Sequence, residues 1–385
     1  MRVLVAPDKF KGSLTAREVA ARVAAGIAEE VPDVEVVQVP VADGGDGTLD
    51  AALAAGYERF AVRAHGPTGD LLDTAFVAHD GVAVVEMADV SGLRLLLPDR
   101  LDALHAGSYG TGEVVRAALE HGCRTVVLGI GGSASTDGGS GMLQALGVRL
   151  LDGAGADLAG GGAALADLDR LDLAGLHPAL AETRVIVASD VDNPLLGPNG
   201  AAAVYGPQKG ASDADVVALD AALAHWADIV EAAVQRGNGG PGAALRHRPG
   251  AGAAGGVGFA AMAVLGARLQ PGIQLVLDLV GFDRHLPEAA LVITGEGALD
   301  AQTLRGKAPA GVAAAATAAG IPVLTVSGRV ELSTDQLRTA GIRQAYALTD
   351  IEPDPQRCLA EAGPLLQTLA RSLAKDWLTS RGEPR

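Results

Sequence analysis

Lysines beside glycines, close to the ends of apolar runs, are the residues of this chain whose types and spacing first indicate phosphate chemistry. The only lysines are Lys9, Lys11, Lys209, Lys307 and Lys375, within a combined total of 30 lysines and arginines. Lysine supplies a compact, mobile ammonium that fits beside a phosphate oxygen, which the larger arginine fork does less well. Lys11 follows the apolar run 3–6, and Lys307 lies in the glycine-containing segment 304–309. We therefore expect Lys11 and Lys307 to bind a ligand, with ordinary surface lysines as the alternative.

Five loops share one pattern, in which an apolar run is followed by glycine with acidic, hydroxyl or lysine residues and then by a helical segment. They are 7–13, 42–48, 129–141, 188–197 and 294–309. Such a loop offers backbone N–H groups and the positive end of a helix dipole to an anion. The loops also carry eight carboxylates, Asp8, Asp43, Asp46, Asp137, Asp190, Asp192, Glu296 and Asp300. Helix capping explains one or two of these carboxylates, but not easily all of them.

This combination indicates phosphoryl transfer, which requires Mg²⁺ on the phosphates, a cation on the transferring group and a carboxylate that orients the attacking hydroxyl. Lys11 is the candidate for the cation. Asp190 is the candidate for the base, because it follows the apolar run 185–188 in a tight Asp-Val-Asp-Asn-Pro turn. A helix-capping or turn aspartate is an equal alternative for Asp190. The histidines, such as His65 and His105, fall in loops or helices without predicted partners, so we predict no Ser-His-Asp arrangement.

Several other classes of protein are disfavoured. No segment fits GxxxxGK[ST], and no GxGxxG follows the first apolar run, which argues against a P-loop ATPase and a Rossmann dehydrogenase. A net charge of −16 repels a nucleic-acid backbone, and 3% aromatic residues offer few stacking surfaces. A small phosphate ligand that arrives with Mg²⁺ remains compatible with this charge. Cys123 and Cys358 have no metal or redox spacing, so we expect buried reduced thiols in a cytoplasmic protein without a membrane span.

The elements that must position these loops alternate between strand and helix near both ends of the chain. We predict strands at 3–6, 34–41, 125–130, 184–189, 291–293, 323–326 and 345–348. Helices are predicted at 15–29, 49–55, 111–120, 213–236, 259–268, 308–319, 333–340 and from about 357. Residues 58–105 lose the alternation and favour an antiparallel or mixed region. Parallel strands joined by right-handed crossovers place their following loops at one sheet edge, where ligands bind.

The simplest architecture is an α/β fold with a doubly wound parallel-sheet domain formed by both chain ends and a second α/β domain inserted between them. We expect the first domain to comprise 1–65 and 286–385, and the inserted mixed α/β domain to comprise 66–285. The cleft between the two domains is the expected place of the site.

Taken together, the loops resemble the sequence signatures of the type I glycerate kinases. The resemblance rests on 6–16 (APDKFKGSLTA), 40–48 (PVADGGDGT), 129–139 (GIGGSASTDGG), 190–197 (DVDNPLLG), 294–297 (TGEG) and 306–309 (GKAP). It covers nearly the whole chain in the right order. It implies a flavodoxin-like first domain and phosphorylation of D-glycerate with ATP as co-substrate and Mg²⁺. The implied product is 2-phosphoglycerate, with 3-phosphoglycerate as the alternative.

The resemblance also implies site residues. Asp190 and Lys11 would be catalytic, and Asp190 would also orient a metal ion. Asp192, which departs from the family pattern, either adds a second metal ligand or only solvates the turn. The residues expected to bind substrate or nucleotide are Asp8, Ser13, Asp43, Gly44, Gly45, Asp46, Gly131, Gly132, Ser133, Asp137, Asn193, Glu296, Asp300 and Lys307. Three positions depart from the family pattern, because Lys9 stands where serine is common, Asp46 where glutamate is usual, and Asp192 where an uncharged polar residue is frequent. Lys9 therefore receives no catalytic role.

Two other functions stay open from the sequence. One is a kinase for another small hydroxy-acid, and the other is a non-catalytic sensor that binds a nucleotide or a hydroxy-acid. In each case the partners are small molecules and not nucleic acid or membrane, and we expect a monomer or a homodimer.

Overall fold

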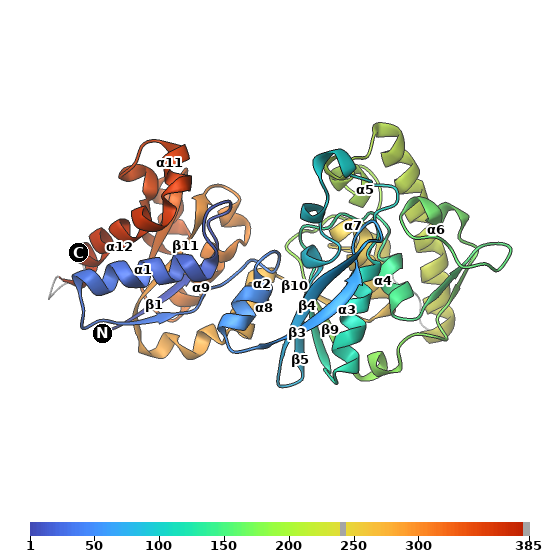
Figure 1. The fold of residues 1–385 in the computed structure, drawn as a ribbon, viewed down its shortest axis with the longest axis horizontal. Helices are drawn as coiled ribbons and strands as arrows, with labels where there is room; N and C mark the ends of the chain where they lie inside the picture. The colour runs from blue at the N-terminus through green and yellow to red at the C-terminus, as the bar shows by residue number, and fades with distance from the viewer. Residues whose placement is uncertain (239–243, 380–385) are drawn as a thin grey trace. The chain divides into compact units, whose positions relative to one another are not determined.

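The computed structural model describes residues 1–238 and 244–379, which fall into two compact units (Figure 1). We call them the terminal unit, Met1–Asp43, Asp50–Gly56 and Gly272–Arg385, and the central unit, Gly44–Leu49 and Tyr57–Pro271. Each unit has its own sheet and its own buried core. The division into these units does not test the domain boundaries expected at 65/66 and 285/286, which stay a prediction.

A five-stranded parallel sheet forms the centre of the terminal unit. Its strands in spatial order are β2 (Glu35–Gln38), β1 (Arg2–Pro7), β11 (Ala289–Leu299), β12 (Val323–Val330) and β13 (Ile342–Ala347). Numbered along the chain within this unit, the order is 2-1-3-4-5, the flavodoxin-like arrangement. The predicted doubly wound α/β fold is therefore confirmed, and the loops after these strands share one edge of the sheet.

Helices cover both faces of this sheet because each central strand is apolar on both sides. Val3 and Val5 pack with α1 (Ala16–Glu30), α11 (Pro355–Ala360) and α12 (Ala362–Leu378). Leu4 and Ala6 face the opposite core, which contains α8 (Gly272–Leu279), α9 (Ala308–Ala318) and α10 (Thr334–Thr339). Near-continuous apolar strands are the sequence pattern of a parallel sheet buried on both faces.

The start of α1 follows the predicted capping box. The Thr15 hydroxyl accepts the Glu18 N–H at 3.2 Å, and the Glu18 carboxylate accepts the Thr15 N–H at 2.8 Å. These two bonds satisfy N–H groups that have no partner within the helix. Fixing this helix start also fixes the end of the preceding loop, which carries Lys11.

A six-stranded mixed sheet forms the centre of the central unit. Its strands in spatial order are β10 (Arg268–Gln270), β9 (Arg184–Ala188), β6 (Thr125–Gly129), β5 (Val82–Glu86), β4 (Leu71–His79) and β3 (Glu58–His65). The β3–β4 and β4–β5 pairs are antiparallel, and the remaining pairs are parallel. The mixed region predicted for 58–105 is thus confirmed. A separate antiparallel pair joins β7 (Arg149–Leu151) and β8 (Arg170–Asp172).

The helices of the central unit surround a large apolar core rich in alanine, valine and leucine. They are α3 (Tyr109–Glu120), α4 (Ser140–Ala145), α5 (Ala201–Tyr205), α6 (Asp213–Asn238) and α7 (Ala253–Val264). The short helix α2 (Thr48–Ala54) has its first residues in the central unit and the rest in the terminal unit. Trp226 of α6 is fully buried, and its indole N–H donates to the Gly138 carbonyl at 3.0 Å.

The prediction of a helix over 259–268 is wrong at its end, whereas its start lies close to the point where regular helical geometry begins, after the positive-φ residues 254–256. The helical segment α7 begins at Ala253 and ends at Val264, and Arg268 begins strand β10. Ala254, Gly255 and Gly256 have positive φ angles inside the first turn. These residues lie tight against the 135–138 loop, because a Cβ on Gly255 would sit 2.0 Å from the Ser135 carbonyl oxygen. Close packing between loops therefore explains a glycine-rich stretch that local propensity assigns to an open loop.

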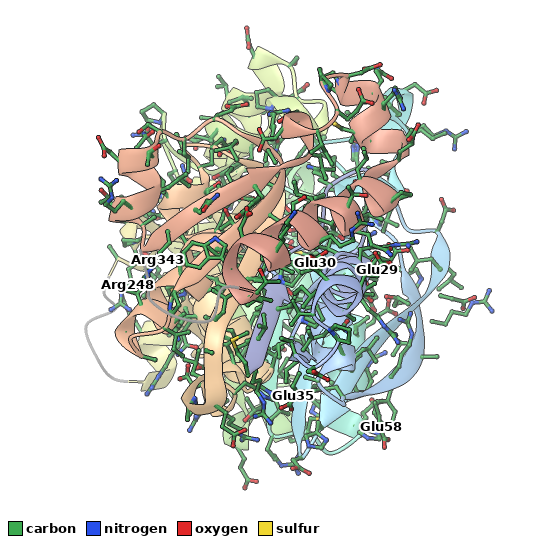
Figure 2. All side chains as sticks on the ribbon, turned by 90° about the vertical axis from the view of Figure 1, so that its left-hand side faces the viewer. Glu29, Glu30, Glu35, Glu58, Arg248 and Arg343 are labelled. Atoms are coloured by element: carbon green, nitrogen blue, oxygen red, sulfur yellow. The ribbon has the colours of Figure 1, made fainter. Side chains whose placement is uncertain are left out.

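Acidic side chains at the amino edge of the terminal unit's sheet are exposed to solvent, unlike the buried carboxylates in the loops at the other edge. Figure 2 labels Glu29 and Glu30 at the end of α1 and Glu35 on β2, all of them exposed. Arg2 pairs with Glu35 at 2.8 Å and also with Glu288. Exposed pairs of this kind contribute little to stability. The buried carboxylates lie at the opposite, carboxyl ends of the strands.

The stretch 308–328, which contains no charged residue, forms α9, a turn and the start of β12. Among the helices of the described chain, none combines the length and the apolar character that crossing a membrane requires.

Candidate active site

In the terminal unit, two loops from neighbouring strands lie against each other. Asp8 follows β1 directly, and its N–H donates to the Gly295 carbonyl of β11 at 2.8 Å. A Cβ on Gly297 would lie 3.3 Å from the Lys11 backbone nitrogen, so glycine permits this approach. The predicted site segments 7–13 and 294–309 are therefore adjacent in this unit, as their places on a parallel sheet require.

Lys11 lies at the tip of a tight turn that is closed by backbone bonds. Phe10 and Leu14 exchange N–H···O bonds of 2.8 and 3.0 Å, and Gly12 has a φ of +85°. The Ser13 hydroxyl donates to the Phe10 carbonyl at 3.1 Å, so this predicted binding residue also supports the turn. The Lys11 side chain is exposed and forms no ion pair with any residue in the described chain. Its ammonium is thus available to an external anion.

Asp8 is a buried carboxylate beside other acids. Its exposure is 7%, and burial raises its pKa to about 7, with the charges of Asp43 and Glu296 adding to the rise and Lys9 opposing it. The Lys9 N–H donates to the Asp8 carboxylate at 2.6 Å. A carboxyl group with such a pKa exchanges a proton near neutral pH, which suits acid or base chemistry. The influence of Asp43 and Glu296 shows that three predicted acids of this unit act on one another electrostatically.

Glu296, Asp300 and Lys307 form a small ionic network. The Thr303 hydroxyl donates to Glu296 at 2.5 Å, and the Lys307 ammonium lies 3.6 Å from Glu296 and 3.9 Å from Asp300. Asp300 also accepts the Gln302 N–H at 2.7 Å, which closes the turn before α9. Burial raises the pKa of Glu296, although Thr303 and Lys307 oppose the rise. These three predicted residues are brought together by the segment between β11 and α9.

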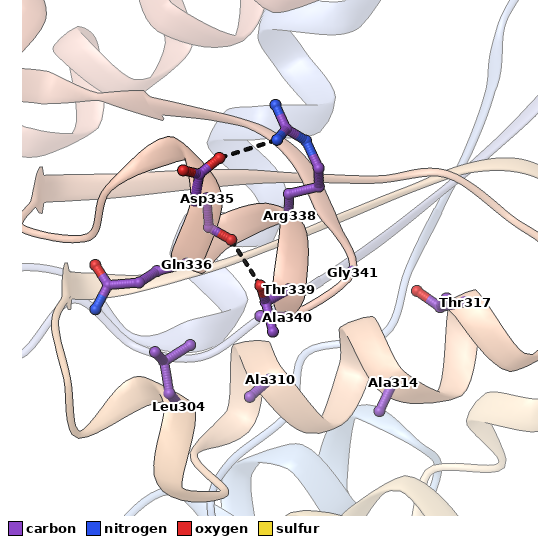
Figure 3. Close-up of a pocket in the computed structure, with 10 residues that line it drawn as sticks. All are labelled: Leu304, Ala310, Ala314, Thr317, Asp335, Gln336, Arg338, Thr339, Ala340 and Gly341. Atoms are coloured by element: carbon purple, nitrogen blue, oxygen red, sulfur yellow. Dashed lines mark hydrogen bonds and ion pairs between the residues drawn. The ribbon is translucent and has the colours of Figure 1, made fainter.

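A cavity of about 660 Å³ also lies in the terminal unit, between α9, α10 and the turn at Leu304 (Figure 3). Its walls include Ala310 and Ala314, and two bonds join polar groups that line it. Asp335 pairs with Arg338 at 2.9 Å, and its carbonyl accepts the Thr339 hydroxyl at 2.8 Å. None of the predicted site residues lines this cavity. We therefore do not assign the chemistry to it.

In the central unit, Glu86 holds the glycine loop 44–49. The Gly47 N–H donates to both carboxylate oxygens at 3.1 and 3.3 Å, and the Leu49 N–H donates at 3.2 Å. Glu86 is 3% exposed, and burial raises its pKa to about 8, with Asp89 adding to the rise. Sequence reasoning missed Glu86 because it ends an apolar strand without a glycine-rich segment after it. Only the structure shows that Glu86 pairs with Gly129 at the end of β5, and the sequence alone carries no signal for this position.

The predicted residues of this glycine loop meet the loop that follows β6. A Cβ on Gly131 would lie 3.1 Å from the Gly45 Cα, and one on Gly129 would lie 2.7 Å from the Gly44 carbonyl oxygen. Asp46 lies 3.7 Å from Arg94, which also pairs with Asp89. The Asp46 carboxylate thus has a cationic neighbour already.

The loop 131–137 is exposed to solvent at its first residues and buried at its last. Gly131 and Gly132 are exposed, whereas Ser133 is 7% exposed and Asp137 is fully buried. Asp137 accepts the Ser108 N–H at 2.8 Å, the Ser108 hydroxyl at 2.7 Å, and the N–H groups of Gly139 and Gly141 at 3.0 and 3.2 Å. Three of these bonds go to Oδ2 and one to Oδ1. Asp137 therefore shapes the loop, and its predicted contact with a ligand stays a prediction.

Lys209 is a second residue that sequence reasoning did not place in the site. Its side chain is 2% exposed, and its ammonium donates to the Ser133 hydroxyl at 3.0 Å and to the Ser135 carbonyl at 2.5 Å. Burial lowers its pKa to about 8, and the charge of Asp137 opposes this shift. The rarity of lysine in the chain was the signal that could have singled it out.

The turn after β9 carries Asp190, Asp192 and Asn193. Both aspartates are exposed. Asp190 caps no described helix, because the next helix begins at Ala201, so the capping half of the alternative is wrong and the turn half stays open. The Asn193 amide donates to the Asn199 carbonyl at 2.8 Å and accepts the Tyr205 hydroxyl at 2.7 Å. Asn193 thus holds the turn that presents the two carboxylates.

Two smaller expectations also have an outcome. His65 and His105 do have partners, because His65 lies 3.0 Å from Glu113 and His105 lies 2.9 Å from Asp102. The expectation of unpartnered histidines is therefore wrong for these two. Cys123 and Cys358 are free and buried, as predicted.

Within the part of the chain that the structure describes, no group of three or more histidine, cysteine, aspartate or glutamate side chains is arranged to hold a metal. Mg²⁺, however, is commonly bound by one or two carboxylates together with substrate phosphates and water. The exposed pair Asp190 and Asp192 has the oxygen donors that fit such a shared ion.

The fold and these loops define an α/β protein whose acidic, glycine-rich loops follow the carboxyl ends of parallel strands, the place where doubly wound enzymes bind ligands. Comparison with known proteins gives the family. The family model described as the glycerate kinase family matches residues 3–378. The chain belongs to the glycerate kinase family, as its loops predicted.

Individual relatives cover nearly the whole chain. The chain is 43% identical over 352 residues to the glycerate 2-kinase of Escherichia coli K12, with 90% of each chain covered. It is 40% identical over 375 residues to the glycerate kinase of Halalkalibacterium halodurans, with 97% of each covered. A crystal structure assigned to glycerate kinase 2 of Salmonella typhimurium LT2 matches with a TM-score of 0.85 at 38% identity, covering 98% of each chain.

Proposed function

We propose that this chain transfers the γ-phosphoryl group of ATP to the 2-hydroxyl of D-glycerate, giving 2-phosphoglycerate, in a reaction that requires Mg²⁺. The observation that carries this proposal is the family match over residues 3–378. The relative at 43% identity is named a glycerate 2-kinase, which favours the 2-hydroxyl over the 3-hydroxyl. The acidic and glycine-rich loops supply the groups that phosphoryl transfer needs.

In the terminal unit, Lys11 would stabilise charge on the transferring phosphoryl group. Its ammonium is exposed and its turn is closed by backbone bonds, so the side chain is presented to a ligand at no cost to another contact. Lys307 would neutralise a ligand oxygen beside Glu296 and Asp300, with which it already forms ion pairs. Asp8 and Asp43 would bind the substrate hydroxyls, with Asp8 available in either protonation state near neutral pH.

In the central unit, Asp190 would accept or orient the proton of the attacking hydroxyl. The N–H groups of the glycine loops, with Ser133, would hold an oxyanion of the phosphate or of the substrate carboxylate. Asp190 and Asp192 would hold Mg²⁺ together with the phosphates, and Mg²⁺ when bound neutralises phosphate charge. Asp46, Asp137 and Asn193 would keep these loops in place through the bonds described above.

We also propose that the protein works in the cytoplasm on small molecules alone, as a monomer or a homodimer. The net charge of −16 disfavours a nucleic-acid partner, and both cysteines are free thiols.

The experiment that tests the proposal measures ADP release from Mg-ATP with D-glycerate, L-glycerate and a panel of other small hydroxy-acids, with and without excess EDTA. Release that depends on D-glycerate and stops with EDTA is the expected result. Preference for another hydroxy-acid would change the substrate assignment, and binding without any release would show a sensor instead of a kinase. Activity that persists in EDTA would contradict the requirement for Mg²⁺.

A further inference from the structure

The buried ammonium of Lys209 has no place in the mechanism above, although it contacts the loop that would hold an oxyanion. Lys209 ends the short 3₁₀ helix η6 (Pro207–Lys209), and its side chain reaches the 133–135 segment after β6. Burying a charged lysine is costly unless it is hydrogen-bonded and electrically compensated. Here two oxygen acceptors and the nearby charge of Asp137 compensate it. Such a residue needs a role that a neutral side chain would not fill.

The direction of the hydrogen bonds suggests that role. An ammonium group can only donate, so the Ser133 oxygen must accept its N–H. The proton of the Ser133 hydroxyl is then left to donate elsewhere, and it donates to no residue in the described chain. A positive charge 3.0 Å from the hydroxyl oxygen makes that hydroxyl a stronger donor. The acceptor that suits such a donor is an oxyanion.

Solvent exposure distinguishes the Ser133 hydroxyl from the other hydroxyl groups of this loop. Ser135 and Thr136 are fully buried, and their hydroxyl oxygens have no partner in the described chain. Ser133 keeps 7% exposure and follows the exposed residues Gly131 and Gly132. Backbone bonds hold the loop in place, because the Gly132 carbonyl accepts the Leu93 N–H at 2.8 Å. The loop therefore presents one hydroxyl, and the lysine lies behind it.

We propose that Lys209 is a positioning residue that acts through Ser133, orienting and strengthening its hydroxyl as the donor to an oxyanion of one co-substrate. The proposal rests on the phosphoryl-transfer function proposed above. Lys209 touches no substrate itself. Its removal should weaken the binding of the co-substrate whose oxyanion Ser133 holds and leave the other co-substrate unaffected.

The test is a double-mutant cycle of Ser133→Ala, Lys209→Met and the double variant, with Lys375→Met as the matched control. Lys375 is exposed on α12, so this control removes one lysine charge outside the loop. Steady-state kinetics with both co-substrates at pH 7 should show about a tenfold loss of kcat/KM in each single variant, equivalent to about 1.4 kcal/mol. The loss should appear as a raised KM for the same co-substrate in both. The kcat/KM of the double variant should be no more than about twofold lower than that of Lys209→Met.

Several results would overturn the proposal. They are wild-type kinetics in Ser133→Ala, losses that multiply to about a hundredfold in the double variant, and a fall in kcat with both KM values unchanged. The last pattern indicates a smaller folded fraction, which thermal unfolding would confirm. Where Lys209→Met does not fold, Lys209→Gln takes its place in the cycle, since it keeps an N–H donor without the charge. If the wild-type chain releases no ADP with any glycerate, the proposed function fails and this proposal fails with it.

Discussion

Replacing Lys11 with alanine should separate catalysis from folding cleanly. The turn that carries Lys11 is held by backbone bonds between Phe10 and Leu14, by the Ser13 hydroxyl and by the positive φ of Gly12. The Lys11 side chain is exposed and forms no ion pair within the described residues. A surface substitution of this kind changes the free energy of unfolding by no more than about 0.5 kcal/mol.

The effect on turnover should be far larger. A cation that acts on charge developing in the transition state contributes roughly 3 kcal/mol, which corresponds to more than about a hundredfold in kcat. Lys11→Ala should therefore lose at least that factor while its melting temperature stays within about 2 °C of the wild type. Lys11→Arg keeps the charge but not the compact ammonium, so its turnover should fall between that of the wild type and that of Lys11→Ala.

The assay is a coupled measurement of ADP release with saturating D-glycerate and Mg-ATP, together with thermal unfolding of the same preparations. Lys375→Ala, on the exposed face of α12, is the control for loss of one positive charge. Wild-type turnover in Lys11→Ala would refute the catalytic role. A large fall in melting temperature would instead show that the turn needs the side chain.

Three further predictions concern the central unit. Asp190→Asn should lower kcat far more than it raises either KM, and a change mainly in KM would move Asp190 to a binding role. Glu86 has a folded-state pKa raised from 4.5 to about 8, so its contribution to stability is present below pH 4.5 and is lost as pH rises to about 8. Glu86→Gln should therefore gain stability relative to the wild type between pH 5 and 8 in denaturant titrations, and a difference that is constant with pH would contradict this. Gly129→Ala should destabilise the unit by about 1–3 kcal/mol, because its Cβ would lie 2.7 Å from the Gly44 carbonyl oxygen, and unchanged unfolding would show that the loops separate freely.

Much of the fold could be predicted because its signals are local. Apolar runs such as 3–6, the capping box at Thr15 and the returning alternation after 286 identify strands and helices without any tertiary information. The parallel pairing of the terminal strands then follows from crossover rules, whereas their flavodoxin-like order was implied only by the resemblance. One strand in this sheet was predicted too short. The sequence indicated three residues, whereas β11 runs from Ala289 to Leu299.

The reason lies in packing that the local sequence does not show. Residues 295–298 read as a glycine-rich loop, yet Glu296 pairs with Ser327 of β12. A Cβ on Gly295 would lie 2.0 Å from the Val326 carbonyl oxygen, so glycine here serves close strand contact and not a loop. This extension places Glu296 at the end of a strand and not on a loose segment.

The site was only partly predictable for a similar reason. Acidic residues next to glycines, such as Asp8 and Glu296, carry a visible signal. Glu86 carries no such signal and Lys209 carries only the rarity of lysine, because each acts on a loop distant in sequence through bonds to backbone or hydroxyl groups. Identifying such residues requires knowing which strands are neighbours, which a single sequence does not state.

The most direct test of the central claim is to identify the product by phosphorus and carbon NMR after incubating the protein with Mg-ATP and D-glycerate. We predict 2-phosphoglycerate, recognised by coupling of the phosphorus to the C2 proton, formed in equal amount to ADP. A phosphate on the 3-hydroxyl would contradict the proposed position of transfer. The absence of any phosphorylated glycerate would contradict the proposed activity itself.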